Sequence, residues 1–262
     1  MLVLLPFVIT TTLVLFQYGA AERNRIMTFP NPRPVPGSAK LGNIVGDHMY
    51  FDDFHSGCME SGNKFFRTAN TSDWLVTDDI DAAVTISDDE PGGVLRIATA
   101  SNAGDFASCQ LNGEGFKVTA GKDIYCEMRL KFDDGNDTRW FFGLATTDVT
   151  GTTLGPILDG VVESIGFRQT TATGTDIFAL VEDGSAETTV DTGVNVVDDT
   201  FLVLAFHVLG TGRVIYWIDG KEVASFTTNI PSGDAITPSM EVQGPTATSI
   251  VEVDYFLCMQ TR

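Results

Sequence analysis

Apolar and polar residues alternate with a period of two through most of the chain after residue 47. The clearest example is the segment 124–132, IYCEMRLKF, in which every second side chain is apolar and most of the side chains between them are charged. This pattern is typical of a strand with one buried and one solvated face. Similar segments predict strands at 84–87, 93–99, 106–111, 139–146, 164–169, 176–182, 201–208, 213–218, 222–227, 238–243 and 249–259.

Turn residues separate these predicted strands. Asp133-Asp134-Gly135, Asp183-Gly184 and Asp219-Gly220 are typical of hairpin connections. No window shows the 3.6-residue apolar period of an amphipathic helix. About a dozen strands joined by short turns indicate an all-β fold, a single large antiparallel β-sandwich.

The first 46 residues have a different pattern. Residues 2–16, LVLLPFVITTTLVLF, are almost wholly apolar, and residues 29–37 contain a proline at every second position from Pro30 to Pro36. The apolar run is shorter than the roughly 20 residues that a bilayer requires, and a proline-rich segment prefers an extended conformation without a core. We therefore expect an extended arm over 1–46 and a sandwich domain over 47–262. The alternative is a secretory signal that ends near Ala21, followed by a flexible linker.

The charge of the chain is strongly negative and unevenly distributed. Sixteen Lys and Arg stand against 35 Asp and Glu among 262 residues, a net charge of −19. The first 46 residues carry +3, so the remaining 216 carry −22. An acidic surface repels polyphosphates and anionic headgroups, so we expect neither nucleic acid nor a membrane as a partner. A hydrophobic content of 43% excludes a disordered acidic chain.

Four cysteines, Cys58, Cys109, Cys126 and Cys258, are spread along the chain without a Cys-x-x-Cys spacing. This disfavours a zinc site and a redox dithiol. Cys126 and Cys258 occupy core-facing positions of predicted strands, where an isolated cysteine commonly behaves as a small apolar side chain. Buried free thiols are therefore expected, while up to two disulfides, in any of three pairings, stay open as an alternative.

The segment 213–224 is a predicted hairpin whose first strand ends in an aromatic pair before Asp219-Gly220. In this hairpin, and in the segments 140–145, 164–168 and 252–257, the chain resembles the concanavalin A-like and laminin G-like jelly-roll sandwiches. Their order is similar to the variants found in structural proteins of tailed bacteriophages. The resemblance covers about residues 50–262 and implies the fold, whereas this sandwich hosts many unrelated functions.

Carboxylates are the first candidates for catalytic residues. Laminarinase-type enzymes, which are similar in fold, carry Glu-x-Asp-x-x-Glu on one strand. The nearest match is the segment 252–257, EVDYFL, which has Leu257 where the second Glu belongs. A retaining glycosidase needs two carboxylates about 5 to 5.5 Å apart. Because that acid is missing, we expect no catalytic residues and no enzyme activity.

Histidines and acidic loops are the other candidates for catalytic or metal-binding residues. His48, His55 and His207 lack a Gly-x-Ser-x-Gly context, and His207 is expected to be a satisfied imidazole at the edge of the core. Acidic loops could supply oxygen ligands for calcium, but solvated turn residues are the favoured interpretation, so no metal or cofactor is expected and calcium is kept as an alternative. The loop residues concerned are Asp78, Asp79, Asp81, Asp133, Asp134, Asn136 and Asp137.

Four aromatic residues could stack on sugar rings: Trp74, Trp140, Tyr216 and Trp217. Trp140 and Trp217 each have a bulky apolar or aromatic neighbour in an alternating segment, so one member of each neighbouring pair should face the core. Core packing is therefore expected for most of the four.

These observations favour a bacteriophage virion structural protein, a decoration or cement protein on the capsid exterior. We expect its partners to be the major capsid protein or other virion subunits, together with copies of itself in a homotrimer. The alternative is a secreted or fibre-borne carbohydrate-binding β-sandwich that recognises a surface glycan. An exposed apolar arm is an aggregation hazard unless a partner covers it, so the arm is the predicted partner-binding segment. Its predicted anchors are Leu4, Phe7, Val8, Leu13, Leu15 and Phe16 as apolar contacts and Arg23, Arg25 and Arg33 as basic ones.

Overall fold

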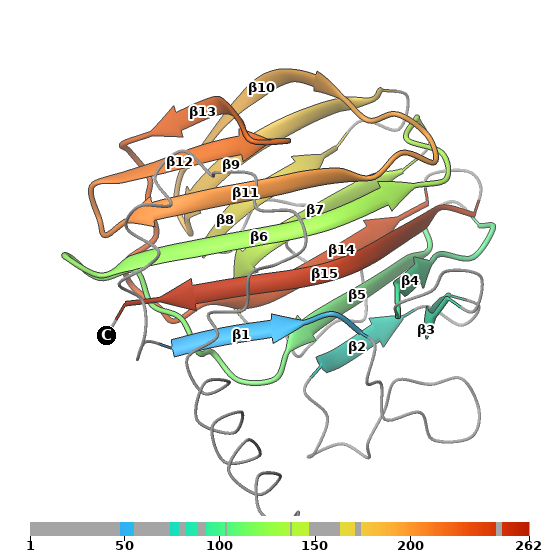
Figure 1. Ribbon diagram of the computed structural model, residues 1–262, viewed down its shortest axis with the longest axis horizontal. Helices are drawn as coiled ribbons and strands as arrows, with labels where there is room; N and C mark the ends of the chain where they lie inside the picture. The colour runs from blue at the N-terminus through green and yellow to red at the C-terminus, as the bar shows by residue number, and fades with distance from the viewer. Residues whose placement is uncertain are drawn as a thin grey trace, which may run out of the picture. The chain divides into compact units, whose positions relative to one another are not determined.

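The computed structural model describes residues 48–54, 74–78, 82–87, 93–102, 104–136, 138–146, 163–170, 174–244 and 248–261. These residues form fifteen strands arranged in two antiparallel sheets that pack face to face (Figure 1). The described ranges contain no helix long and apolar enough to cross a membrane. The prediction of an all-β antiparallel sandwich is confirmed.

The front sheet in Figure 1 has eight strands and is built around a central pair, β6 and β15. β1 pairs with the end of β15, and β4 pairs with its beginning. The order along the sheet is β13 (Lys221–Phe226), β12 (Arg213–Ile218), β11 (Leu202–Leu209), β6 (Asp123–Phe132), β15 (Ile250–Gln260), β4 (Leu95–Ala98) and β3 (Ala83–Ile86), with β1 (His48–Asp52) beside β15.

The back sheet has seven strands, which lie behind the front sheet in Figure 1. Its order is β10 (Glu187–Asn195), β9 (Asp176–Asp183), β8 (Glu163–Gln169), β7 (Arg139–Ala145), β14 (Thr237–Gln243), β5 (Phe106–Leu111) and β2 (Trp74–Asp78). β1, β2 and β10 were not predicted from the sequence. β10 is an edge strand with mostly exposed side chains, so it lacks the apolar period from which a strand is recognised.

The core lies between the two sheets and consists of the inward side chains of both. Trp140 and Tyr216 are fully buried there, and Trp74 is 3% exposed. The Tyr216 hydroxyl donates a hydrogen bond to the Leu180 carbonyl oxygen at 2.5 Å. Core packing of these three aromatic residues is confirmed. Trp217, the neighbour of Tyr216, lies on the opposite face of the front sheet because strand side chains alternate.

Cys126 and Cys258 form a disulfide across the central pair of the front sheet. They are register partners on β6 and β15, and both are fully buried. The prediction of free thiols is therefore wrong for this pair. The alternating pattern places each cysteine in the core, but it does not show that their two strands are neighbours. Cys109 is a buried free thiol, as expected, and burial raises its pKa far above the ordinary value.

The backbones of β7 and β8 approach closely where Gly143 faces Gly166. A Cβ atom at position 143 would overlap the Ile165 carbonyl oxygen. We expect Gly143→Ala to lower the free energy of unfolding by about 2 kcal/mol, because neither strand can move without disturbing the ladder. Urea unfolding would measure this loss. Gly212→Ala is the matched control, since its Cβ would meet only ordinary contacts, and equal losses in the two variants would contradict the prediction.

Candidate functional site

The outer face of the front sheet, which points away from the core, carries a group of polar and aromatic side chains. β6 places Tyr125, Glu127, Arg129 and Lys131 on this face, whereas the residues between them are fully buried in the core. The alternation predicted for 124–132 is therefore confirmed.

A β-bulge in β15 brings two more side chains to this face. The register with β6 shifts between Val253 and Tyr255, and both Val253 and Phe256 are fully buried in the core. The two residues between them, Asp254 and Tyr255, consequently both lie on the outer side. Bulges commonly redirect side chains in this way. Strict alternation would have placed Tyr255 in the core beside Val253, so the sequence pattern could not have identified it.

Glu127 lies at the centre of this group and is held by two tyrosines. The Tyr255 hydroxyl donates to its Oε1 at 2.7 Å, and the Tyr125 hydroxyl donates to its Oε2. Burial, with a further contribution from the Glu127 charge, raises the pKa of both tyrosines. The phenols therefore stay protonated and act as donors, which orients the carboxylate of Glu127.

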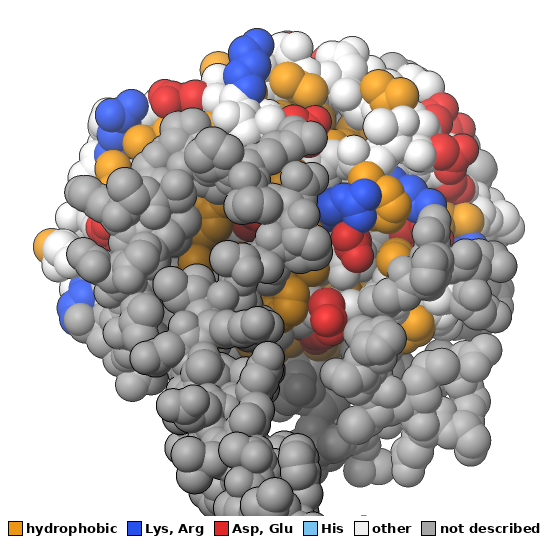
Figure 2. Space-filling view, viewed as in Figure 1, with side chains coloured by type: hydrophobic (Ala, Val, Ile, Leu, Met, Phe, Trp, Pro, Cys, Tyr) orange, Lys and Arg blue, Asp and Glu red, His pale blue; other side chains and the backbone are white. Residues whose placement is uncertain are grey.

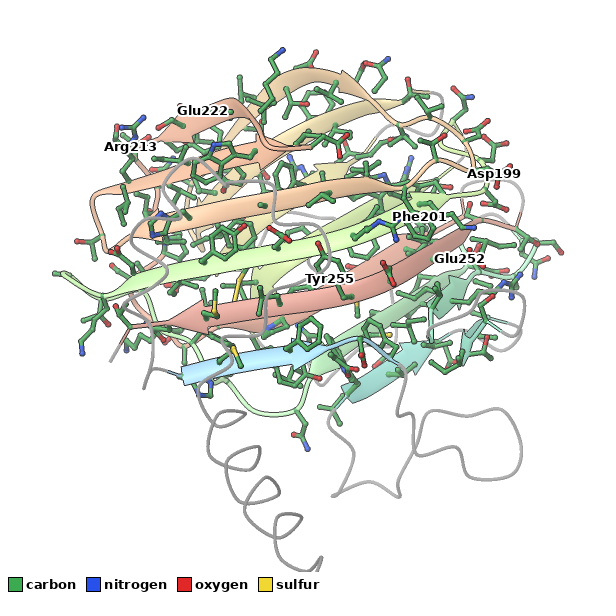
Figure 3. All side chains as sticks on the ribbon, viewed as in Figure 1. Asp199, Phe201, Arg213, Glu222, Glu252 and Tyr255 are labelled. Carbon is green, nitrogen blue, oxygen red and sulfur yellow. A yellow bond between two sulfur atoms is a disulfide. The ribbon has the colours of Figure 1, made fainter. Side chains whose placement is uncertain are left out.

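An ion pair and an aromatic ring lie on the same face of the sheet as Glu127. Arg129 pairs with Asp254, and the Arg129 Cζ atom lies 3.8 Å from the centroid of the Phe201 ring. Figure 3 shows Phe201 and Tyr255 on this face of the sheet, and Figure 2 shows acidic, basic and apolar side chains side by side there. We call Glu127, Arg129, Phe201, Asp254 and Tyr255 the aromatic–carboxylate patch. Partly exposed ion pairs such as Arg129–Asp254 contribute little to stability.

The structure also shows the surroundings of the segment 252–257, the nearest match to the glycosidase motif. Glu252 lies next to the patch and pairs with Lys131, its Oε2 atom 2.8 Å from Lys131 Nζ. Leu257, which stands where the second Glu was sought, is the register partner of Glu127 on the neighbouring strand. The sheet therefore supplies a carboxylate beside Leu257 from β6. The residues of one strand cannot reveal this carboxylate, because Glu127 and Leu257 are 130 positions apart in sequence.

The remaining predicted candidates have other surroundings. The His207 Nε2 lies 3.4 Å from Asp123 Oδ2 at the edge of the same face, and the His48 ring packs against Phe116. The Asp133 carboxylate accepts the Ile250 backbone N–H at 2.8 Å, as expected of a turn residue. Within the ranges that the structure describes, no group of three or more His, Cys, Asp or Glu could hold a metal ion. His55, Asp79, Asp81 and Asp137 lie outside those ranges.

All predicted residues of the arm lie outside the described residues, which begin at His48. The set comprises Leu4, Phe7, Val8, Leu13, Leu15, Phe16, Arg23, Arg25 and Arg33. Partner binding through the arm, the homotrimer and the division of the chain at residue 46 therefore stay predictions.

No protein-family model and no curated protein matches the sequence. Solved structures do match the fold. An endo-1,3-β-glucanase from Streptomyces sioyaensis matches with a TM-score of 0.55 and 13% identity, over 81% of this chain and 95% of that one. A β-glucanase from Bacillus licheniformis matches with a TM-score of 0.51 and 14% identity, over 83% and 99%. A protein of unknown function from Shewanella oneidensis MR-1 matches with a TM-score of 0.52 and 16% identity, over 82% and 87%.

These matches establish that the chain has the concanavalin A-like jelly-roll fold of glucanases; they do not establish the phage structural kind of this fold. They also contradict the prediction that the chain is not an enzyme, because the matching structures include enzymes built on this fold. That prediction rested on Leu257, yet the fold is one on which glucanases are built, and Glu127 lies beside the position where an acid was missing.

Proposed function

We propose that this protein binds a polysaccharide on the outer face of its front sheet, through the aromatic–carboxylate patch. The observation that carries the proposal is the bulge in β15, which places Asp254 and Tyr255 on one face, where Tyr255 bonds Glu127. The shared fold with two glucanases supports a polysaccharide as the ligand.

The patch contains the groups that sugar recognition uses. The partly exposed Tyr255 ring offers an apolar face on which a pyranose ring can stack. The carboxylates of Glu127 and Asp254 accept hydrogen bonds from sugar hydroxyls, and the Arg129 guanidinium donates them. Because each charged group already has a partner in the patch, the side chains are oriented before the ligand arrives, which lowers the entropic cost of binding.

The test is binding of soluble β-1,3-glucan and mixed-linkage β-1,3-1,4-glucan, measured by calorimetry. We expect Tyr255→Ala to weaken binding about tenfold, because the variant loses both the stacking ring and the donor to Glu127. Tyr255→Phe keeps the ring and should lose less. Glu127→Gln should weaken binding by removing a charged acceptor.

Phe178→Ala is the matched control, since Phe178 is a partly exposed aromatic residue on the other sheet. Its binding should equal that of the unmodified protein. Release of reducing ends is measured in the same samples, and release that depends on Glu127 would make the bound polysaccharide a substrate. If neither glucan binds, or if Tyr255→Ala and Phe178→Ala bind alike, the proposal is refuted.

Attachment to a virion through the arm is a separate proposal that rests on the sequence alone. It is tested by mass spectrometry of the mature amino terminus. A retained arm agrees with it, and cleavage after Ala21 would instead agree with a secreted protein.

A further inference from the structure

The aromatic surface of the front sheet continues from β15 onto β1, beyond the aromatic–carboxylate patch. Tyr50 packs against the core, so its neighbour Phe51 lies on the outer face, because strand side chains alternate. The ring centroids of Phe51 and Tyr255 are 6.2 Å apart, and the two rings are tilted by 38°. Both side chains are partly exposed. Two accessible aromatic rings therefore lie side by side on neighbouring strands.

A guanidinium follows these two rings on the next strand. Tyr255 is the register partner of Arg129 on β6, and the Arg129 side chain is 37% exposed. Asp254 pairs with this guanidinium on one side, and the Phe201 ring contacts it on another, 3.8 Å from Cζ to the ring centroid. These two neighbours orient the guanidinium, whose other N–H groups can donate to a ligand in a fixed plane. We call Phe51, Tyr255 and Arg129 the outer row.

The outer row crosses the strands and is longer than one side chain can make it. Its members come from β1, β15 and β6, which are consecutive neighbours in the front sheet. Neighbouring strands are about 4.8 Å apart, so the row extends roughly 10 Å across the sheet. A single sugar ring would contact one member of the row and part of the next. A chain of linked sugar rings would contact all of them.

The charges beside the outer row favour a neutral ligand. Arg129 pairs with Asp254, and Lys131 pairs with Glu252 at 2.8 Å, so these four charges balance. Glu127 adds a carboxylate, and the chain as a whole has a net charge of −19. An acidic polysaccharide would therefore be repelled. The hydroxyl groups of a neutral sugar can donate to the carboxylates and accept from the guanidinium.

We propose that the outer row binds at least three consecutive units of an unbranched, neutral glucan, so that the protein recognises a stretch of polymer and not a single sugar. This inference rests on the proposed function and extends it, because it assigns the preference for chain length to Phe51. One unit stacks on the Tyr255 ring and the next unit stacks on the Phe51 ring. Arg129 donates hydrogen bonds to the hydroxyl groups of a third unit.

The test compares glucose with the β-1,3-linked trisaccharide of glucose by NMR titration of the full chain. We expect the trisaccharide to bind at least about tenfold more tightly, because it contacts a second ring and the guanidinium. Phe51→Ala should lower the affinity for the trisaccharide about fivefold and leave the affinity for glucose unchanged. Phe51→Leu keeps an apolar side chain on β1 but removes the ring, so it should lose a similar factor.

Met49→Ala is the matched control, because Met49 is an exposed apolar residue on the same face of β1. It should keep the preference for the trisaccharide. Similar losses in Met49→Ala and Phe51→Ala, or an unchanged affinity for the trisaccharide in Phe51→Leu, would overturn the assignment to the Phe51 ring.

Two further outcomes separate this inference from the proposed function. Equal affinities of the unmodified protein for glucose and the trisaccharide would overturn the outer row and leave sugar binding by the patch intact. Binding of neither sugar would refute both. Tighter binding of the trisaccharide of galacturonic acid than of the glucose trisaccharide would overturn the neutral ligand.

Discussion

Loss of the Cys126–Cys258 disulfide is expected to lower the free energy of unfolding by about 4 kcal/mol. The two cysteines are 132 residues apart in sequence, and a cross-link that closes a loop of this length strongly restricts the unfolded chain. The bond also joins β6 and β15, the central strands of the front sheet. Urea unfolding of the Cys126→Ala, Cys258→Ala double variant would measure the loss.

The control for this experiment is Cys109→Ala, which removes a buried thiol that forms no disulfide. A reductant should lower the stability of the unmodified protein and of Cys109→Ala to a similar extent, and it should leave the double variant unchanged. If the unmodified protein unfolds at the same urea concentration with and without a reductant, the disulfide does not contribute as described.

Raising the pH from about 5 to about 8 is expected to destabilise the fold through Glu182. Burial, aided by the Glu187 and Asp183 charges and opposed by Arg168, raises the pKa of Glu182 from 4.5 to about 7. The folded protein therefore holds this proton more tightly than the unfolded chain does. The resulting stabilisation is full below pH 4.5 and is lost as the pH rises through about 7. The loss amounts to about 2 to 3 kcal/mol.

Unfolding by urea at a series of pH values separates this contribution from those of other groups. Glu182→Gln stays neutral, so its stability should fall less than that of the unmodified protein between pH 5 and 8. Glu222→Gln, an exposed ion-paired position on β13, should keep the slope of the unmodified protein. Parallel curves for the unmodified protein and Glu182→Gln would show that Glu182 does not titrate in this range.

β6 and β10 show which strands can be predicted from the order of residues and which cannot. In β6, apolar side chains at every second position face the core and charged ones face outward, so the strand and its two faces could be predicted. Asp219-Gly220 similarly marked a hairpin turn, and both residues have positive φ values there. β10 could not be predicted, since an exposed edge strand needs no apolar period.

The candidate site shows where residue order is insufficient. Glu127 was correctly placed on the wet face of its strand, but nothing local indicates that Tyr255 and Leu257 lie across from β6. The bulge at Asp254, the Cys126–Cys258 bond and the register that places Ser164 opposite Glu182 all depend on which strands pair.

The alternation of apolar and polar residues along a strand is a local property, because it depends only on whether each side chain is buried or exposed to water. It therefore determined the fold class and most of the strands with their two faces, but not the exposed edge strand β10 or the outward position of Tyr255. Pairing between strands is set by the packing of the whole sandwich, which brings together residues more than 100 positions apart. Only this packing assembled the aromatic–carboxylate patch, because its carboxylates and rings come from different strands that share one sheet.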